Sequence, residues 1–363
     1  MEQNTSDIRP IINKPTKQRD KTLDIYRGCS MIYITCFLHN IYGVQVIDTV
    51  VTSLFLITMP IVFIIAGASF SLASPKTYPD YLWSRTKRIV FPYYILVMFV
   101  TLYHLITDCI VGNETIGEFI HQFIDNGYYN IFSGELYEFN PVWFIPVYLL
   151  IAIILPLFGY IKQHITKAGI YTALIIITVL LAFIPDNMLC YGTFAFAGLY
   201  YKDKLPVNRY IVAFIFACGI GYCLWQNYDL NMQHNKFPPN ILFFSYTGLI
   251  IALFIKQIAW LCRRIYQIPF LRYFIDIYAR LGLTVYLYHS INVLILRQIL
   301  YRIASTYSIS AIGNICLLIL TSIILLIGNA YLSIFMKKAE TCLIDWGAKT
   351  WNKSKHFFIR TEQ

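Results

Sequence analysis

Residues 22–44 read TLDIYRGCSMIYITCFLHNIYGV, a stretch that is mostly apolar but begins with Asp24 and Arg27 and carries His39 near its end. A helix needs about 20 mostly apolar residues to cross a bilayer, and this stretch is long enough. It therefore predicts a first transmembrane helix. Ionisable residues inside such a helix are costly, so each of these three side chains is a candidate for function.

The same apolar pattern recurs along the rest of the chain. Of its 363 residues, 58% are hydrophobic and 13% are charged, whereas a soluble domain has about 25% charged residues. The sixth apolar segment is short and contains Gly192 and Gly198, so we expect it to be tilted or broken. The composition predicts an all-α integral membrane protein with about ten transmembrane helices in one bundle. The predicted spans are 22–44, 49–74, 88–110, 142–161, 168–185, 189–201, 209–227, 241–257, 281–302 and 308–336.

The positive charges give these spans an orientation. Lys and Arg gather in the N-terminal segment, in 75–88, 162–167, 201–209 and 256–280, and in the tail from Lys337. The alternate connections contain only one of them, Lys236, but eight of the 19 acidic residues. Cytoplasmic loops collect Lys and Arg, so the pattern predicts that both termini are cytoplasmic. We expect one membrane domain, 22–336, between a cytoplasmic N-terminal segment, 1–21, and a cytoplasmic tail, 337–363.

Composition also excludes several classes of protein. The net charge is +10, but it is spread in short clusters between apolar segments, so nucleic-acid binding is not expected. The nine cysteines form no CxxC pair, so neither a disulfide framework nor a metal site is indicated. Two connections stand out by length. The external one, 111–141, is either a functional lid or a solvated cap, and the internal one, 256–280, is typical of an amphipathic stretch on the inner leaflet.

Within the first predicted helix, Asp24 and Arg27 are three residues apart, so they share a face and can neutralise each other. His39 lies roughly 18 Å further along the helix axis, toward the outer side. This combination suits a reaction whose donor arrives from the cytosol and whose acceptor lies outside. The alternatives stay open: His39 could be a packed histidine, and Arg27 could anchor the helix at the inner interface.

Other candidates are weaker. His104 and His289 could each be a second acid or base, or a histidine packed between helices. A basic cluster just before the third span, made of Arg85, Lys87 and Arg88, could bind the phosphates of a cytosolic ligand through charge-assisted hydrogen bonds. The same cluster could serve only as a topology signal that contacts anionic lipid.

Several blocks, in order, resemble the membrane acyltransferase-3 family. The opening block is Leu23-Asp24-Ile25-Tyr26-Arg27-Gly28 with the apolar run to His39. Similar in the same way are Met59 to Gly67, Arg85 to Tyr93, Val142-Trp143-Phe144, Lys236-Phe237-Pro238-Pro239-Asn240 and Arg280 to His289. Together they extend over most of the chain, from residue 23 to about residue 290.

The resemblance implies a membrane acyltransferase that moves an acetyl or other short acyl group from cytosolic acyl-CoA. Acetyl-CoA would be a co-substrate, with no bound cofactor. Implied acceptors are hydroxyls of cell-surface polysaccharides, lipid-linked glycans or other envelope molecules, in the inner membrane of a bacterium. His39 would be catalytic, with Arg27 and Asp24 as donor-binding or structural partners, and Trp143 is a further weak candidate. The alternative is a transporter or flippase of glycan or lipid-linked precursors, although the predicted spans have almost no carboxylates for coupling ions.

One spacing departs from the family's pattern. Eleven residues separate Arg27 from His39, whereas the family usually has ten. Twelve steps along an ideal α-helix leave the two side chains about 120° apart. Either a π-bulge absorbs the additional residue, or this chain belongs to a subgroup with another arrangement.

Overall fold

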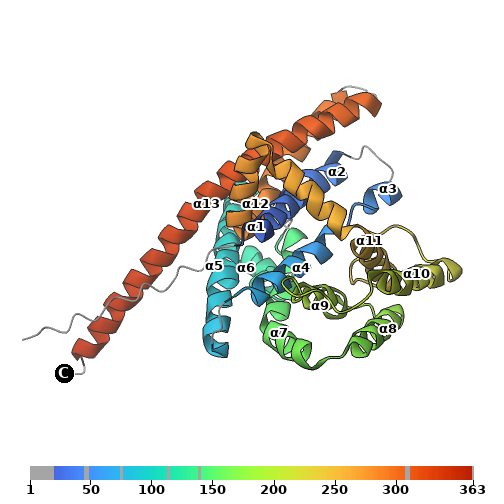
Figure 1. Cartoon of the computed structure of the whole chain (residues 1–363). Helices are drawn as coiled ribbons and strands as arrows, with labels where there is room; N and C mark the ends of the chain where they lie inside the picture. The colour runs from blue at the N-terminus through green and yellow to red at the C-terminus, as the bar shows by residue number, and fades with distance from the viewer. Residues whose placement is uncertain are drawn as a thin grey trace, which may run out of the picture.

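A computed structural model describes residues 20–44, 49–73, 77–112, 115–137, 140–306 and 311–361 (Figure 1). In these ranges the chain is helical apart from turns and one isolated bridge between Lys236 and Pro239. The helices are α1 (Lys21–Ile32), η1 (Tyr33–Leu38), α2 (His39–Val44), α3 (Thr49–Ser53), α4 (Thr58–Ser71), α5 (Tyr78–His104), η2 (Leu105–Val111), α6 (Ile116–Asp125), η3 (Asn140–Trp143), α7 (Phe144–His164), α8 (Lys167–Phe183), α9 (Asn187–Gly198), α10 (Arg209–Trp225), α11 (Ile241–Tyr266), α12 (Pro269–Thr306) and α13 (Ala311–Thr361).

Each of the ten predicted spans contains helix. In the described part of the chain, 6 helical segments are long and apolar enough to cross a membrane by themselves. The helices α8 and α10 are apolar but shorter, and α9 has only 12 residues. An all-helical, multi-pass membrane protein is therefore indicated, while the count of ten spans and the cytoplasmic termini stay predictions. The 6 segments are Val50–Ser71, Tyr78–Cys109, Phe144–His164, Ile241–Tyr266, Pro269–Leu300 and Ile315–Trp346.

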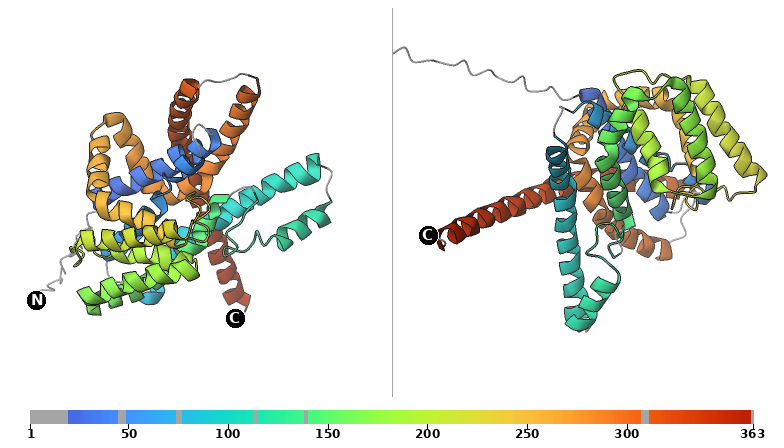
Figure 2. Two further views of the ribbon diagram at one scale, coloured as in Figure 1. Left: turned by 90° about the vertical axis from the view of Figure 1, so that its right-hand side faces the viewer. Right: turned by 90° about the horizontal axis from the view of Figure 1, so that it is seen from below.

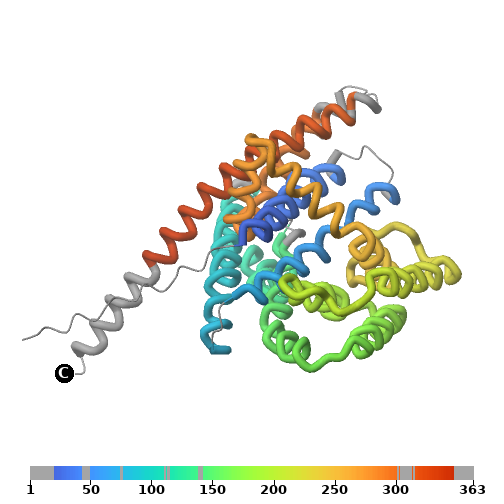
Figure 3. The backbone as a smooth tube through the Cα atoms, in the orientation of Figure 1, coloured from blue at the N-terminus to red at the C-terminus, as the bar shows by residue number. Residues whose placement is uncertain are grey.

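The first predicted span contains a π-helical segment, η1, between Arg27 and His39. The backbone N–H of His39 bonds the carbonyl of Ile34, five residues earlier. A π-segment absorbs one residue without ending the helix, so α1, η1 and α2 follow one course beside α12 (Figure 3). The widened turn is supported from α13, where Asn329 Nδ2 donates to the carbonyl of Thr35 at 3.3 Å. Of the two explanations for the unusual spacing, the structure therefore supports the first, a π-helical segment that absorbs the additional residue.

Small residues set the closest helix contacts. A Cβ atom on Gly28 of α1 would overlap the carbonyl oxygen of Ile275 in α12. On the other side of the bundle, Gly67 of α4 and Gly198 of α9 each lie directly against the partner helix's backbone. Membrane helices pack through such residues because backbones can then approach closely. α9, which we expected to be tilted or broken, is a short helix packed against α4 and α7.

The connection predicted at 256–280 is almost entirely helical. α11 continues to Tyr266, and α12 already begins at Pro269. α12 then bends at Leu281, whose φ of −104° and ψ of 15° are not helical. The predicted start of the ninth span coincides with this bend, because the apolar pattern begins only beyond it.

The predicted external connection 111–141 is folded. It contains α6, whose first turn is closed by a capping box between Thr115 and Glu118. Ile131 and Leu136 further along are part of the main apolar core, so this connection packs on the bundle. Figure 2 shows α5 and α6 together as an arm that leaves the main group of helices. At the other end of the chain, α13 continues beyond residue 336, where we had placed the end of the membrane domain.

Candidate active site

The structure brings His39 of α2 and His289 of α12 together. His39 Nδ1 lies 2.5 Å from His289 Nε2, although 250 residues separate them in the sequence. The ring centroids are 4.7 Å apart and the ring planes differ by 19°. With so short a distance between the nitrogens, this centroid separation means that the two rings meet edge to edge. The hydrogen bond therefore lies close to both ring planes, the direction in which imidazole donates and accepts.

A backbone carbonyl sets the proton positions in this pair. His289 Nδ1 lies 2.7 Å from the carbonyl oxygen of Tyr286, and a carbonyl only accepts, so Nδ1 must carry a proton. In neutral His289 the other nitrogen, Nε2, is then an acceptor, and His39 Nδ1 must donate to it. His39 Nε2 is left with its lone pair unprotonated. The arrangement thus presents one basic nitrogen on a ring whose orientation is fixed by a second ring.

The two rings differ in access. His289 is 1% exposed, whereas His39 is partly exposed. Next to His39, the Asn40 amide donates to Thr321 Oγ1 at 2.8 Å and to Ser322 Oγ at 2.9 Å, which fastens α2 to α13. The helix that carries His39 is therefore held by both α12 and α13, and His39 is the more exposed residue of the pair.

Aromatic side chains continue outward from this pair. The Tyr286 ring lies 5.6 Å from that of His289 and 5.1 Å from that of Phe144. Trp143, a weak candidate from the sequence, meets Phe237 edge to face at 4.4 Å. Trp143 thus belongs to an aromatic wall built from α7, α12 and the turn before α11.

Arg27 and Asp24 form the ion pair expected from their spacing, with 2.5 Å between Arg27 Nη1 and Asp24 Oδ1. The other terminal nitrogen of Arg27 donates to Ser69 Oγ of α4 at 2.9 Å. Arg27 therefore connects α1 to α4. At the start of α1, Lys21 pairs with Asp276 of α12 at 2.8 Å. This end of the helix is held by complementary charges.

The predicted phosphate-binding cluster lies on α5, which begins earlier than the predicted span. Arg85 lies over the ring of Tyr81 at 5.0 Å and Lys87 over that of Trp83 at 4.9 Å. Lys87 and Arg88 line a depression of about 470 Å³. The cluster is therefore exposed on one helix rather than enclosed.

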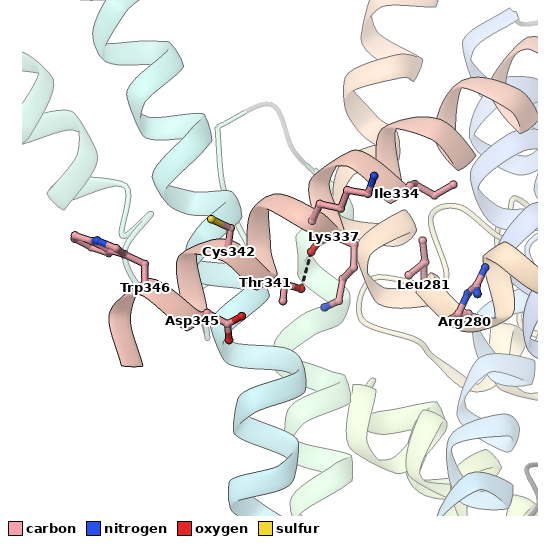
Figure 4. Close-up of a pocket in the computed structure, with 9 residues that line it drawn as sticks. Arg280, Leu281, Ile334, Lys337, Thr341, Cys342, Asp345 and Trp346 are labelled. Atoms are coloured by element: carbon pink, nitrogen blue, oxygen red, sulfur yellow. Dashed lines mark hydrogen bonds between the residues drawn. The ribbon is translucent and has the colours of Figure 1, made fainter. Parts of the chain in front are cut away.

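A larger cleft, of about 840 Å³, lies where α13 passes the bend of α12 (Figure 4). Three cations and one carboxylate share it with apolar and aromatic walls. No pattern in the sequence distinguished this cleft, because its two sides are far apart in the chain. Its lining is Arg280, Leu281, Ile334, Lys337, Lys338, Thr341, Cys342, Asp345 and Trp346.

His104 lies apart from the pair of histidines. Its Nδ1 is 3.2 Å from Asp108 Oδ2, and its ring stacks on that of Tyr137 with centroids 3.9 Å apart. Among the contacts of the described residues, it forms neither a hydrogen bond nor a ring contact with His39. His104, the last residue of α5, thus contacts the folded external connection through Tyr137.

Sequence reasoning missed two charged residues. Glu340, which we assigned to the tail, is 0% exposed, bonds Thr284 Oγ1 at 3.3 Å and pairs with Lys337 at 2.9 Å. Lys236, seen only as part of a motif, lies close enough to His39 for its charge to act on the ring. A signal for Lys236 was present, since it is the one basic residue in the outer connections.

Comparison with known proteins gives one match. The family model described as an acyltransferase domain, that of the membrane acyltransferase-3 proteins, matches residues 20–334. No curated protein and no solved structure matches the chain. The matched range includes α1, both histidines of the pair and most of the helical bundle. With most of its length matched in this way, the chain belongs to the membrane acyltransferase-3 family.

Proposed function

We propose that this membrane acyltransferase moves an acetyl or other short acyl group from acyl-CoA to a hydroxyl of a cell-surface polysaccharide, a lipid-linked glycan or another envelope molecule. The observation that carries the proposal is the His39–His289 pair, which leaves His39 Nε2 unprotonated as a base. A general base must lie within hydrogen-bond reach of the proton it removes and be held in position. His39 has that position because His289 and the Tyr286 carbonyl fix its ring.

In the direct scheme, His39 Nε2 takes the proton of the acceptor hydroxyl while its oxygen attacks the thioester carbonyl. The C–S bond then breaks, the new ester forms, and the proton passes from His39 to the departing CoA thiolate. In the second scheme, Nε2 itself attacks the thioester carbonyl and the C–S bond breaks, which gives an acyl-histidine and the CoA thiolate. The acceptor hydroxyl then attacks the acyl carbon, the C–N bond breaks, and the hydroxyl proton passes through water to the thiolate. Both schemes use the same nitrogen, and both need His289 as the group that orients it.

For the donor, we propose that the nucleotide stays at the predicted inner face while its thin pantetheine arm reaches toward α1. Two basic surfaces support this: the α5 cluster with Arg85, Lys87 and Arg88, and the cleft between α12 and α13. Phosphate groups bind best where several cations converge. The cleft collects Arg280, Lys337 and Lys338 around apolar walls, and it lies beside the bend in the helix that carries His289.

The test is release of free thiol from acetyl-CoA by the purified protein in detergent, with and without extracted envelope glycan. We expect thiol release that depends on the glycan and disappears in His39→Ala. A correctly folded protein that neither binds nor turns over acyl-CoA would overturn the proposal and favour the transporter or flippase. We also propose the inner membrane of a bacterium as the location, on the family resemblance alone.

A further inference from the structure

The turn between α10 and α11 holds Lys236 in a fixed position. Asn235 Nδ2 donates to the carbonyls of Asp229 and Asn231 at 2.6 and 2.8 Å, and Asn240 Nδ2 donates to Asn235 Oδ1 at 2.6 Å. Asn231 and Asn235 are both buried. Such a connected set of buried amides rigidifies a segment because every polar group is satisfied. Lys236 therefore does not project from a loose loop.

This turn is also fastened to the rest of the bundle. The backbone N–H of Met232 donates to Ser53 Oγ at 2.9 Å, and that of Asp186 donates to the carbonyl of Pro239 at 3.1 Å. Phe237 packs edge to face on Trp143 of the aromatic wall. The turn thus packs on the aromatic wall that continues from the pair of histidines, and the charge of Lys236 is near enough to act on the His39 ring.

Among the described residues, no anion compensates the charge of Lys236. Its ammonium lies 4.5 Å from the centre of the Phe237 ring, and the side chain is only partly exposed. Within the part of the chain that the structure describes, Lys236 forms no ion pair, and the nearby Asp229 is occupied by His234 at 2.5 Å. Taking an ammonium out of water costs free energy unless an anion compensates it. Burial accordingly lowers the pKa of Lys236 to about 8, so it is still mostly protonated near pH 7.

We infer that Lys236 is a specificity-determining residue, which binds a carboxylate or phosphate that the acceptor carries close to its reacting hydroxyl. The inference rests on the proposed function in calling the bound molecule an acceptor. The ammonium supplies the charge and up to three donors, and Trp143 and Phe237 supply flat walls for a sugar ring. The donor's phosphates have their own basic surfaces at the opposite, predicted inner side, so they do not account for this cation.

The experiment compares three sugars that share one ring: methyl glucoside, which is neutral, methyl glucuronide, which has a carboxylate, and glucose 1-phosphate. Dissociation constants for the purified protein in detergent are measured by ligand-observed NMR. We expect at least one charged sugar to bind roughly ten-fold tighter than the neutral one, as one charge-assisted hydrogen bond provides. The charged sugar that binds tighter identifies carboxylate or phosphate as the natural group. No preference for either charged sugar, including no binding at all, would overturn the inference.

Three variants test whether the preference for a charged sugar depends on Lys236. Lys236→Gln should abolish the preference, and Lys236→Arg should keep it, because Arg retains the charge. Lys204→Gln removes one exposed positive charge on the other predicted side and should leave the preference unchanged. If Lys204→Gln lowers it as much as Lys236→Gln does, the preference is a general effect of net charge and the inference fails. If Lys236→Gln does not fold, the binding of the three sugars to the native protein and to Lys236→Arg still tests the inference.

The two proposals fail in different ways. A charge preference that depends on Lys236, in a protein without acyl-CoA turnover, would leave the anion site intact and remove the acyltransferase proposal. Acceptor-dependent thiol release without any charge preference would support the acyltransferase proposal and remove the anion site.

Discussion

The two ends of the first membrane helix are built differently. At its beginning, Lys21, Asp24 and Arg27 each have an oppositely charged partner, and Arg27 also bonds Ser69. At its end, His39 bonds a second histidine and lies beside Lys236, a cation with no ion pair among the described residues. The charges at the beginning of the helix therefore balance each other, whereas the described residues provide no counter-charge for Lys236 at its end.

This difference distinguishes the polar groups that hold the first helix against its neighbours from the polar groups that can react. Complementary charges that satisfy each other fix helix packing and have little left for a ligand. A base and a cation that share no carboxylate are costly to hold in place, so a function is the reason to keep them. We therefore place the chemistry at the His39 end of the helix.

Replacing His39 by Ala should reduce acyl transfer by about 10²- to 10⁴-fold, the range for removal of a general acid or base. The protein should still insert and elute as the native protein does, because Asn40 also fastens α2 to α13. The measurement is the initial rate of thiol release with the glycan acceptor. A rate near that of the native protein would contradict both chemical schemes and the division drawn above.

His289→Ala should lower the maximal rate by roughly 10- to 100-fold, as removal of an orienting partner does, with little change in the acyl-CoA concentration that gives half that rate. His289→Gln is the matched variant, because its side-chain oxygen can accept the Nδ1 proton of His39. We expect it to recover part of the lost rate. If Gln is no better than Ala while both proteins are folded, His289 packs the helix and does not orient His39.

Arg27→Ala should lower the stability in detergent by about 1–2 kcal/mol, because Asp24 is then left mostly buried without its partner. Removing both charges, in Asp24→Asn with Arg27→Gln, should recover part of this loss. The thermal midpoint of each variant gives the stability, and thiol release over a range of acyl-CoA concentrations gives the donor dependence. A double variant that is stable but needs much more acyl-CoA would make Arg27 a donor ligand.

The affinity for a charged sugar should fall as the pH rises through about 8. Lys236, whose pKa burial lowers to about 8, is positively charged below that pH and neutral above it, so its attraction for an anion is present at pH 7 and lost by pH 9. His39 is its titratable neighbour, and Lys236→Arg isolates the lysine because arginine stays protonated throughout. An equal fall in native protein and Lys236→Arg would assign the pH dependence to another group.

The two basic surfaces at the other end are distinguished by paired substitutions. Lys87→Gln with Arg88→Gln tests the α5 cluster, and Arg280→Gln with Lys338→Gln tests the cleft between α12 and α13. Each pair removes two positive charges, so each controls for the other. We expect the pair that contacts the donor to raise the half-saturating acyl-CoA concentration about three- to ten-fold. Equal, small changes would mean that neither surface binds the nucleotide.

Much of this molecule follows from local sequence. Each of the ten apolar segments contains helix in the structure, and the Asp24–Arg27 pair follows from a spacing of three residues. The incorrect predictions concern the polar ends of helices, where hydrophobic patterns in the sequence give the weakest signal. Apolar content marks only the part of a helix that is in lipid, so the polar beginnings of α5 and α12 and the buried Glu340 of α13 were misplaced.

By itself, the sequence determined the membrane class, the helices, the order of the family's blocks and His39 as the leading candidate, because each depends on residues that are neighbours in the chain. Only the tertiary structure decided that His289 pairs with His39, that η1 absorbs the additional residue and that the charge of Lys236 acts on the His39 ring. Those facts depend on how helices distant in the sequence pack together. That packing is set by close contacts such as Gly28 against Ile275, which no hydrophobic pattern records.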